Sequence, residues 1–138
     1  MTVQEAIAAA ERILPGRAAP EGETDPRWQA IIAVAEFIET DPELVWQFAL
    51  RWGSVADSDL QTAIGTCVLE HLLQHHFDGY ISRIEEAVLV DANFAGAAAM
   101  CWKFGQSKSS AARSTRFDGL IRLARARSSR RRNRKPTA

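Results

Sequence analysis

The sequence predicts an all-α fold built from antiparallel helix pairs, and three observations support this prediction. A helix-start signal recurs: "TDPRW" at Thr24–Trp28 returns as "TDPEL" at Thr40–Leu44, and Asp57 follows Asp41 by the same interval of sixteen residues. Apolar residues between these signals recur at helical spacing. No stretch alternates apolar and polar residues over the length of a strand. An interval of sixteen residues accommodates about three turns of helix and a short turn.

The first expected helix begins at the N-terminus. Thr2 and Glu5 fit the capping box, in which the side chains of the two residues bond each other's backbone N–H groups. An alanine-rich helix then extends to about Leu14, and Pro15 and Gly16 end it.

Two helices follow, and each begins with an Asp-Pro pair. Asp25 and Asp41 suit the N-cap position, and the proline that follows suits the first helical position because no N–H is needed there. The expected helices are Pro26–Glu39 and Pro42–Trp52, and Gly53 ends the second.

Three more helices are expected before the composition changes. The longest runs from Ser58, with Gln61 completing a second capping box, to about His76. Gly79–Val90 and Asn93–Phe104 follow. Residues 1–105 therefore form the expected helical domain.

The segment 106–138 differs in composition and charge. From Lys108 to the end there are eleven basic residues and one acid, a net charge of +10, whereas the preceding residues carry −10. We expect a largely disordered basic tail. A short amphipathic helix over 115–127 is possible, because four apolar residues recur there at helical spacing: Phe117, Leu120, Ile121 and Ala124.

The stretch "CVLEHLLQHHFD" invites a metal-site interpretation, because Cys67, His71 and His75 follow one another at four-residue steps. However, the spacing C-x3-H-x3-H matches no common zinc module. Helical phase places all three residues within the apolar stripe of their helix. We therefore expect His71 to be largely buried, and we expect no metal and no cofactor.

Four tryptophans could together form a base-stacking surface. Helical phase assigns Trp28 and Trp52 to the core, and the fourth is Trp102. Trp46 lies off the main apolar stripe of its helix, so it is the preferred candidate for an exposed contact with a partner.

The repeated helix starts over Asp25–Gly105 resemble HEAT-like helical repeats of the armadillo type, as in small bacterial-type members. The two-helix unit of thirty-two residues is shorter than the HEAT norm of about 40. The resemblance implies a short α-α superhelix that presents a groove to a partner. A DNA-repair glycosylase family also uses this architecture, with aromatic residues and an Asp on a basic concave surface, whereas the body of this chain is acidic.

Three functional hypotheses follow. The first is a non-enzymatic protein-interaction module whose acidic body favours a basic partner; capping explains Asp25, Asp41 and Asp57 without catalysis, and Asp59 stays unassigned. The second is nucleic-acid binding through the basic residues of the tail. Those residues are Arg122, Arg125, Arg127, Arg130, Arg131, Arg132, Arg134 and Lys135. The third is autoregulation, in which the basic tail folds back on the acidic body.

The sequence also bears on location. Its two cysteines make no disulfide framework, its N-terminus lacks the features of a signal peptide, and no apolar run reaches the length of a membrane span. A cytoplasmic protein is expected.

Overall fold

The computed structural model describes residues 1–103 and 110–133, with side chains described as far as residue 129. Every regular element within these residues is helical, which confirms the all-α prediction. The elements are α1 (Val3–Glu11), α2 (Pro26–Ala35), α3 (Pro42–Gly53), α4 (Ser58–Ile64), the π-helical turn η1 (Gly65–Leu69), α5 (Glu70–Val90), α6 (Ala92–Ala98) and α7 (Ala111–Asn133).

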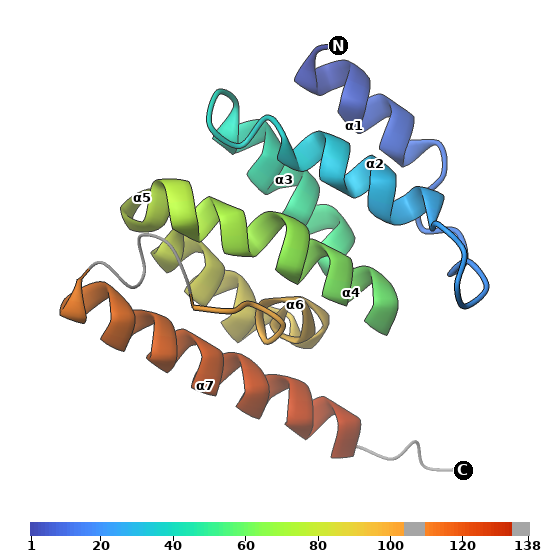
Figure 1. Ribbon diagram of the computed structural model, residues 1–138. Coiled ribbons are helices and arrows are strands. Elements are labelled where there is room, and N and C mark those ends of the chain that lie inside the picture. Colours follow the sequence, from blue (N-terminus) through green and yellow to red (C-terminus); the bar gives the residue numbers. More distant parts are fainter. Residues whose placement is uncertain (104–109, 134–138) are drawn as a thin grey trace.

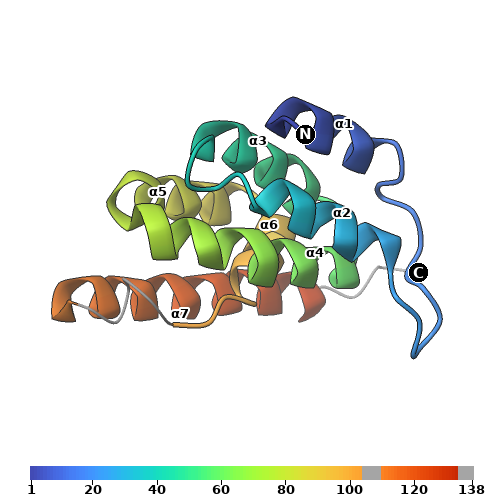
Figure 2. The same ribbon diagram turned by 45° about the horizontal axis from the view of Figure 1, so that its top comes forward.

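The helices pack in an order that largely follows the chain. Figure 1 and Figure 2 show α1 at one edge of the molecule and α7 at the opposite edge. Between them, α1 packs on α2, α3 packs on α4, and α6 packs on both α4 and α7. Most contacts between helices are therefore made by helices that are neighbours in this stack.

Several helix starts follow the expected signals, and others differ in the residue that caps them. Thr2 and Glu5 form the capping box. Asp25 accepts a hydrogen bond from the Arg27 N–H at 2.9 Å. Asp57 accepts one from the Leu60 N–H at 3.0 Å, and so it caps α4 in place of the expected Ser58 capping box. Asp41 occupies the N-cap position of α3 but makes no capping bond.

Two expected helices end earlier in the structure. The second stops at Ala35 and continues as turns through Thr40, instead of extending to Glu39. The last begins after Asp91, which caps it through the Asn93 and Phe94 N–H groups, and α6 ends at Ala98.

The expected long helix and its end are both present. Helical residues are continuous from Ser58 through η1, and His76 has non-helical dihedral angles (φ −139°, ψ 47°) within α5. The chain reverses direction there, so that the second half of α5 returns beside the first (Figure 1).

Gly65, the first residue of η1, lies directly against α6, because a Cβ atom on it would lie 2.2 Å from the Ala97 carbonyl oxygen. Only glycine permits this close approach.

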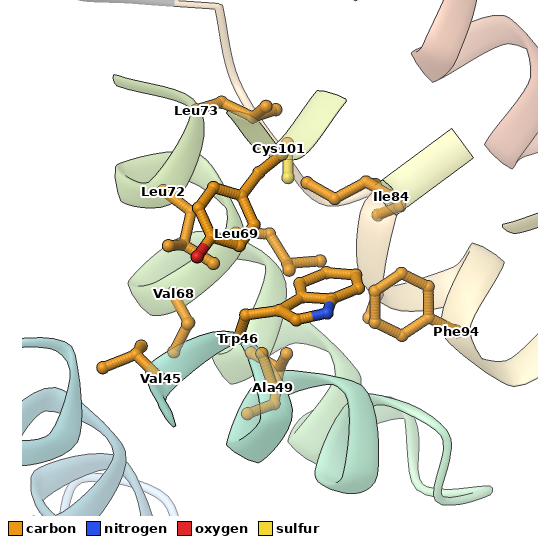
Figure 3. Close-up of a cluster of buried hydrophobic side chains, with 14 of the residues drawn as sticks. Val45, Trp46, Ala49, Val68, Leu69, Leu72, Leu73, Ile84, Phe94 and Cys101 are labelled. Atoms are coloured by element: carbon orange, nitrogen blue, oxygen red, sulfur yellow. The ribbon is translucent and has the colours of Figure 1, made fainter. Parts of the chain in front are cut away.

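The core is one cluster of buried apolar side chains, and Trp46 lies within it (Figure 3). Its exposed fraction is 3%, so the expectation of an exposed Trp46 is wrong. The reason is that α3 is covered on two sides. The indole of Trp46 lies 6.0 Å from the ring of Tyr80 and 5.8 Å from that of Phe94, between ring centroids.

A largely disordered tail is not confirmed for residues 111–133, which form α7. This helix is longer than the expected 115–127. It is ordered because its apolar residues join the core: Phe117, Leu120, Ile121 and Ala124 are all buried. Arg134 and Lys135 lie outside the described residues.

Candidate partner-binding groove

A groove of about 730 Å³ lies between α7 and the segment that follows α6. We call it the Trp102 groove. Its lining residues include Met100, Cys101, Trp102, Lys103, Arg122 and Arg125. It combines apolar and cationic side chains at one place on the surface.

Trp102 is the most exposed large aromatic side chain among the described residues, at 75%. Its backbone is nevertheless fixed, because its N–H donates to the Glu70 carboxylate at 2.5 Å. Next to it, the buried Cys101 thiol donates to the Gly65 carbonyl oxygen at 3.5 Å. The segment is thus attached to η1 and α5 while the indole faces solvent.

Burial shapes the ionisation of both anchoring groups. Desolvation raises the pKa of Glu70, although the hydrogen bond from Trp102 acts in the opposite direction. Burial also raises the pKa of the Cys101 thiol. The thiol therefore stays protonated and can donate its hydrogen bond across the neutral range.

The cations of the groove are of two kinds. Lys103 is neutralised, because its Nζ lies 2.6 Å from an Asp118 carboxylate oxygen. Arg122 and Arg125 are exposed, and neither forms a hydrogen bond or ion pair with the part of the chain that the structure describes. Two guanidinium groups on successive turns of α7 are therefore available to a ligand.

Other arginines of α7 attach the helix to α5. Arg113 pairs with Asp78 at 2.7 Å. Arg116 pairs with Glu85 at 2.8 Å. Arg127 donates to the Leu89 carbonyl oxygen at 2.5 Å. The arginines of this helix thus divide between holding it in place and facing solvent.

The residues expected to bind nucleic acid are therefore not equivalent. Arg122 and Arg125 line the groove, whereas Arg127 contacts the body. Arg130, Arg131 and Arg132 belong to α7, but their side chains lie outside the described part of the structure. Arg134 and Lys135 lie outside it altogether.

The sequence does not distinguish Trp102 from the other tryptophans as an exposed residue. The predicted helix Asn93–Phe104 places it on a helical face, whereas α6 ends at Ala98 and Trp102 follows in a segment without regular secondary structure. Helical phase could not find a residue that lies outside the helix. The alanine-rich run before it gives no clear stop signal.

The histidine cluster lies elsewhere, at a pocket of about 520 Å³ between the end of α2 and the consecutive helical segments η1 and α5. Cys67, His71 and His75 all line it, and all three are half-buried, so His71 is less buried than expected. His75 Nδ1 lies 3.2 Å from a Glu39 carboxylate oxygen, and His71 Nδ1 lies 3.3 Å from the Gln74 side-chain oxygen. No metal-binding group of three or more ligands occurs within the described residues.

A buried arginine, which the sequence did not reveal, contacts the aspartates at the starts of α2 and α4. Arg27 is 3% exposed and contacts Asp25, Asp57 and Asp59 at 3.4, 3.4 and 2.5 Å. Burial raises the pKa of Asp25, but hydrogen bonds from the Ala19 and Arg27 N–H groups and the guanidinium outweigh it, so the net shift is downward. Asp59 therefore belongs to a structural ion-pair network that joins α2 to α4.

Comparisons with protein families, with curated proteins and with solved structures found no match to this chain. The resemblance to HEAT-like repeats stays a prediction. None of the helices among residues 1–103 and 110–133 combines the length and the apolar character that crossing a membrane requires.

Proposed function

We propose that this chain is a non-enzymatic protein-interaction module of the HEAT-like kind, with its helices stacked as a short superhelix, and that its partner binds in the Trp102 groove. The observation that carries this proposal is Trp102 itself, exposed by three quarters on a backbone held by Glu70. Tryptophan, methionine and arginine are enriched in protein interfaces, and tryptophan and arginine dominate their binding energy.

The groove also favours binding because its walls are already ordered before a partner arrives. A binding surface that is already ordered avoids the entropic cost of immobilising it. The hydrogen bonds of Cys101 and Trp102 fix one wall, and the buried residues of α7 fix the other. A partner therefore meets the aromatic and cationic groups in place.

Site-specific photo-crosslinking in the source cells tests this proposal. A benzophenone amino acid placed at position 102 should yield a discrete protein adduct, identified by mass spectrometry. The matched control carries it at Gln29, an exposed residue of α2 away from the groove. The adduct should disappear when Arg122 and Arg125 are replaced by alanine. Adducts that are equal from both positions, or that persist in the double variant, would contradict the proposal.

A second candidate function is nucleic-acid binding through α7, and Arg122 and Arg125 favour it, because they are exposed and form no ion pair with the residues that the structure describes. The basic run continues along the same helix with Arg130, Arg131 and Arg132. Phosphate contacts make affinity depend on salt, with a slope of about 0.9 for each duplex phosphate contact. Replacing the first two of these arginines, or the last three, should lower the magnitude of that salt slope for any duplex sequence. A full-length protein that ignores duplex near physiological salt would exclude this candidate.

A further inference from the structure

We infer that the occupant of the Trp102 groove is an acidic peptide segment of the partner, with one apolar side chain seated against Met100 and Trp102 and carboxylates at Arg122 and Arg125. This inference rests on the proposed function and adds the chemistry of the partner. The acidic composition of the body favours a basic partner, whereas the charges in the groove favour an acidic one.

The first step concerns charge. The residues that line the groove include three basic side chains and one acid, and the acid, Asp118, is already paired with Lys103. Among the described residues, the charges of Arg122 and Arg125 therefore have no partner. The two residues are three positions apart on α7, a separation that brings side chains together on one helix face. Guanidinium groups bind carboxylates with two parallel hydrogen bonds, so the pair suits acidic side chains on a peptide.

The second step concerns the apolar surface. Met100 is 42% exposed and Trp102 is 75% exposed at the rim, and the buried side chains of Phe117 and Ile121 form the floor. Such a site excludes water around an apolar side chain that enters it. Methionine adapts its shape to different side chains, whereas the tryptophan offers a fixed flat surface. An aliphatic or aromatic anchor on the peptide would cover both.

The third step separates a peptide from a nucleic acid. A single-stranded nucleic acid binds through aromatic platforms and a cationic track along its backbone. Trp102 would supply a platform, but the floor made by Phe117 and Ile121 offers a polar sugar-phosphate chain no hydrogen bond. An acidic peptide with an apolar anchor fits both parts of the groove.

Selection of a random peptide library against the full-length protein tests the inference. We expect enriched peptides to combine Asp or Glu with an aliphatic or aromatic residue. Their affinity should fall by about tenfold or more in Trp102→Ala and in the double variant Arg122→Gln, Arg125→Gln. The charge-reversed double variant Arg122→Glu, Arg125→Glu should instead enrich peptides with Lys or Arg. Circular dichroism and urea unfolding of each variant check that the fold persists, since all three residues are exposed.

The remaining outcomes discriminate between the two proposals. Enriched peptides that depend on Trp102 but carry no excess of acid would overturn the acidic partner and leave the interaction module standing. No enrichment above that of Trp102→Ala would overturn both. A labelled single-stranded oligonucleotide that binds the wild type, and loses binding in Trp102→Ala when no peptide is enriched, would identify the occupant as a nucleic acid.

Discussion

The indole ring of Trp46 meets the phenyl ring of Phe94 edge to face, with an interplanar angle of 83° and 5.8 Å between ring centroids. This contact joins α3 to α6. Aromatic pairs in this geometry contribute about 0.5–1.5 kcal/mol beyond the burial of their area. Tyr80 approaches the same indole from α5, so one side chain connects three helices.

Replacing Trp46 by alanine should therefore lower the free energy of unfolding by about 3–5 kcal/mol, because it empties a large site in the core. Trp102→Ala is the matched control and should change it by less than about 0.5 kcal/mol, because its indole faces solvent. Urea denaturation followed by circular dichroism measures both. Equal losses in the two variants would contradict the assignment of Trp46 to the core and Trp102 to the surface.

The parts of this fold that the sequence predicted depend on short-range signals. Asp25, Asp57 and the Thr2–Glu5 capping box act on N–H groups within three residues, so their helix starts were predictable. The expected helix end near His76 is also present, because the backbone there leaves helical dihedral angles. Local chemistry decides these features whatever the rest of the chain does.

The parts that the sequence missed depend on contacts between distant residues. Trp46 is buried because helices thirty and more residues later in the chain cover it. Arg27 is buried because Asp57 and Asp59 come to it from α4. The Trp102 groove exists only where α7 packs beside the end of α6. Periodicity within one helix carries no information about such packing.

The helix caps give a second prediction. Asp57→Ala should destabilise the protein by about 1 kcal/mol, because it removes the acceptor for the Leu60 N–H. Asp41 also occupies an N-cap position, but Asp41→Ala should cost less than about 0.5 kcal/mol, because among the described residues its carboxylate accepts only from the neighbouring Thr40 hydroxyl at 2.9 Å. Thermal unfolding of the two variants compares them directly. An Asp41 variant as unstable as the Asp57 variant would show that both residues cap.

The buried arginine gives a third prediction. Arg27→Met keeps most of the side-chain volume but leaves Asp25, Asp57 and Asp59 without their common cation. Breaking a buried pair in this way costs about 3 kcal/mol, at the low end of the usual range because the aspartates are partly exposed. Arg17→Met is the control, since Arg17 is exposed in the same part of the chain. Equal stability of Arg27→Met and the wild type in urea would mean that the network contributes nothing.

The final prediction concerns Glu43 at the start of α3. Its carboxylate accepts hydrogen bonds from both terminal nitrogens of Arg83, one of them at 2.7 Å, and from the Tyr80 hydroxyl at 3.1 Å. The hydrogen bonds from Arg83 lower the pKa of Glu43 from 4.5 to about 2, against the smaller opposing effect of burial. A lowered pKa in the folded state means that the ionised form stabilises the fold. This contribution is therefore complete above the ordinary pKa of 4.5 and is lost as the pH falls through about 2.

Arg83→Met should return the pKa of Glu43 towards 4.5, and carbon-detected NMR titration of the carboxyl measures it directly. The variant should also lose less stability than the wild type between these two pH values, because its Glu43 protonates at nearly the same pH in the folded and unfolded chains. Both side chains are partly exposed, so added salt should reduce the difference. Arg116→Met is the control, because Arg116 pairs with Glu85 and should leave the titration of Glu43 unchanged. A wild-type Glu43 that titrates near 4.5 would mean that the ion pair with Arg83 does not persist in solution.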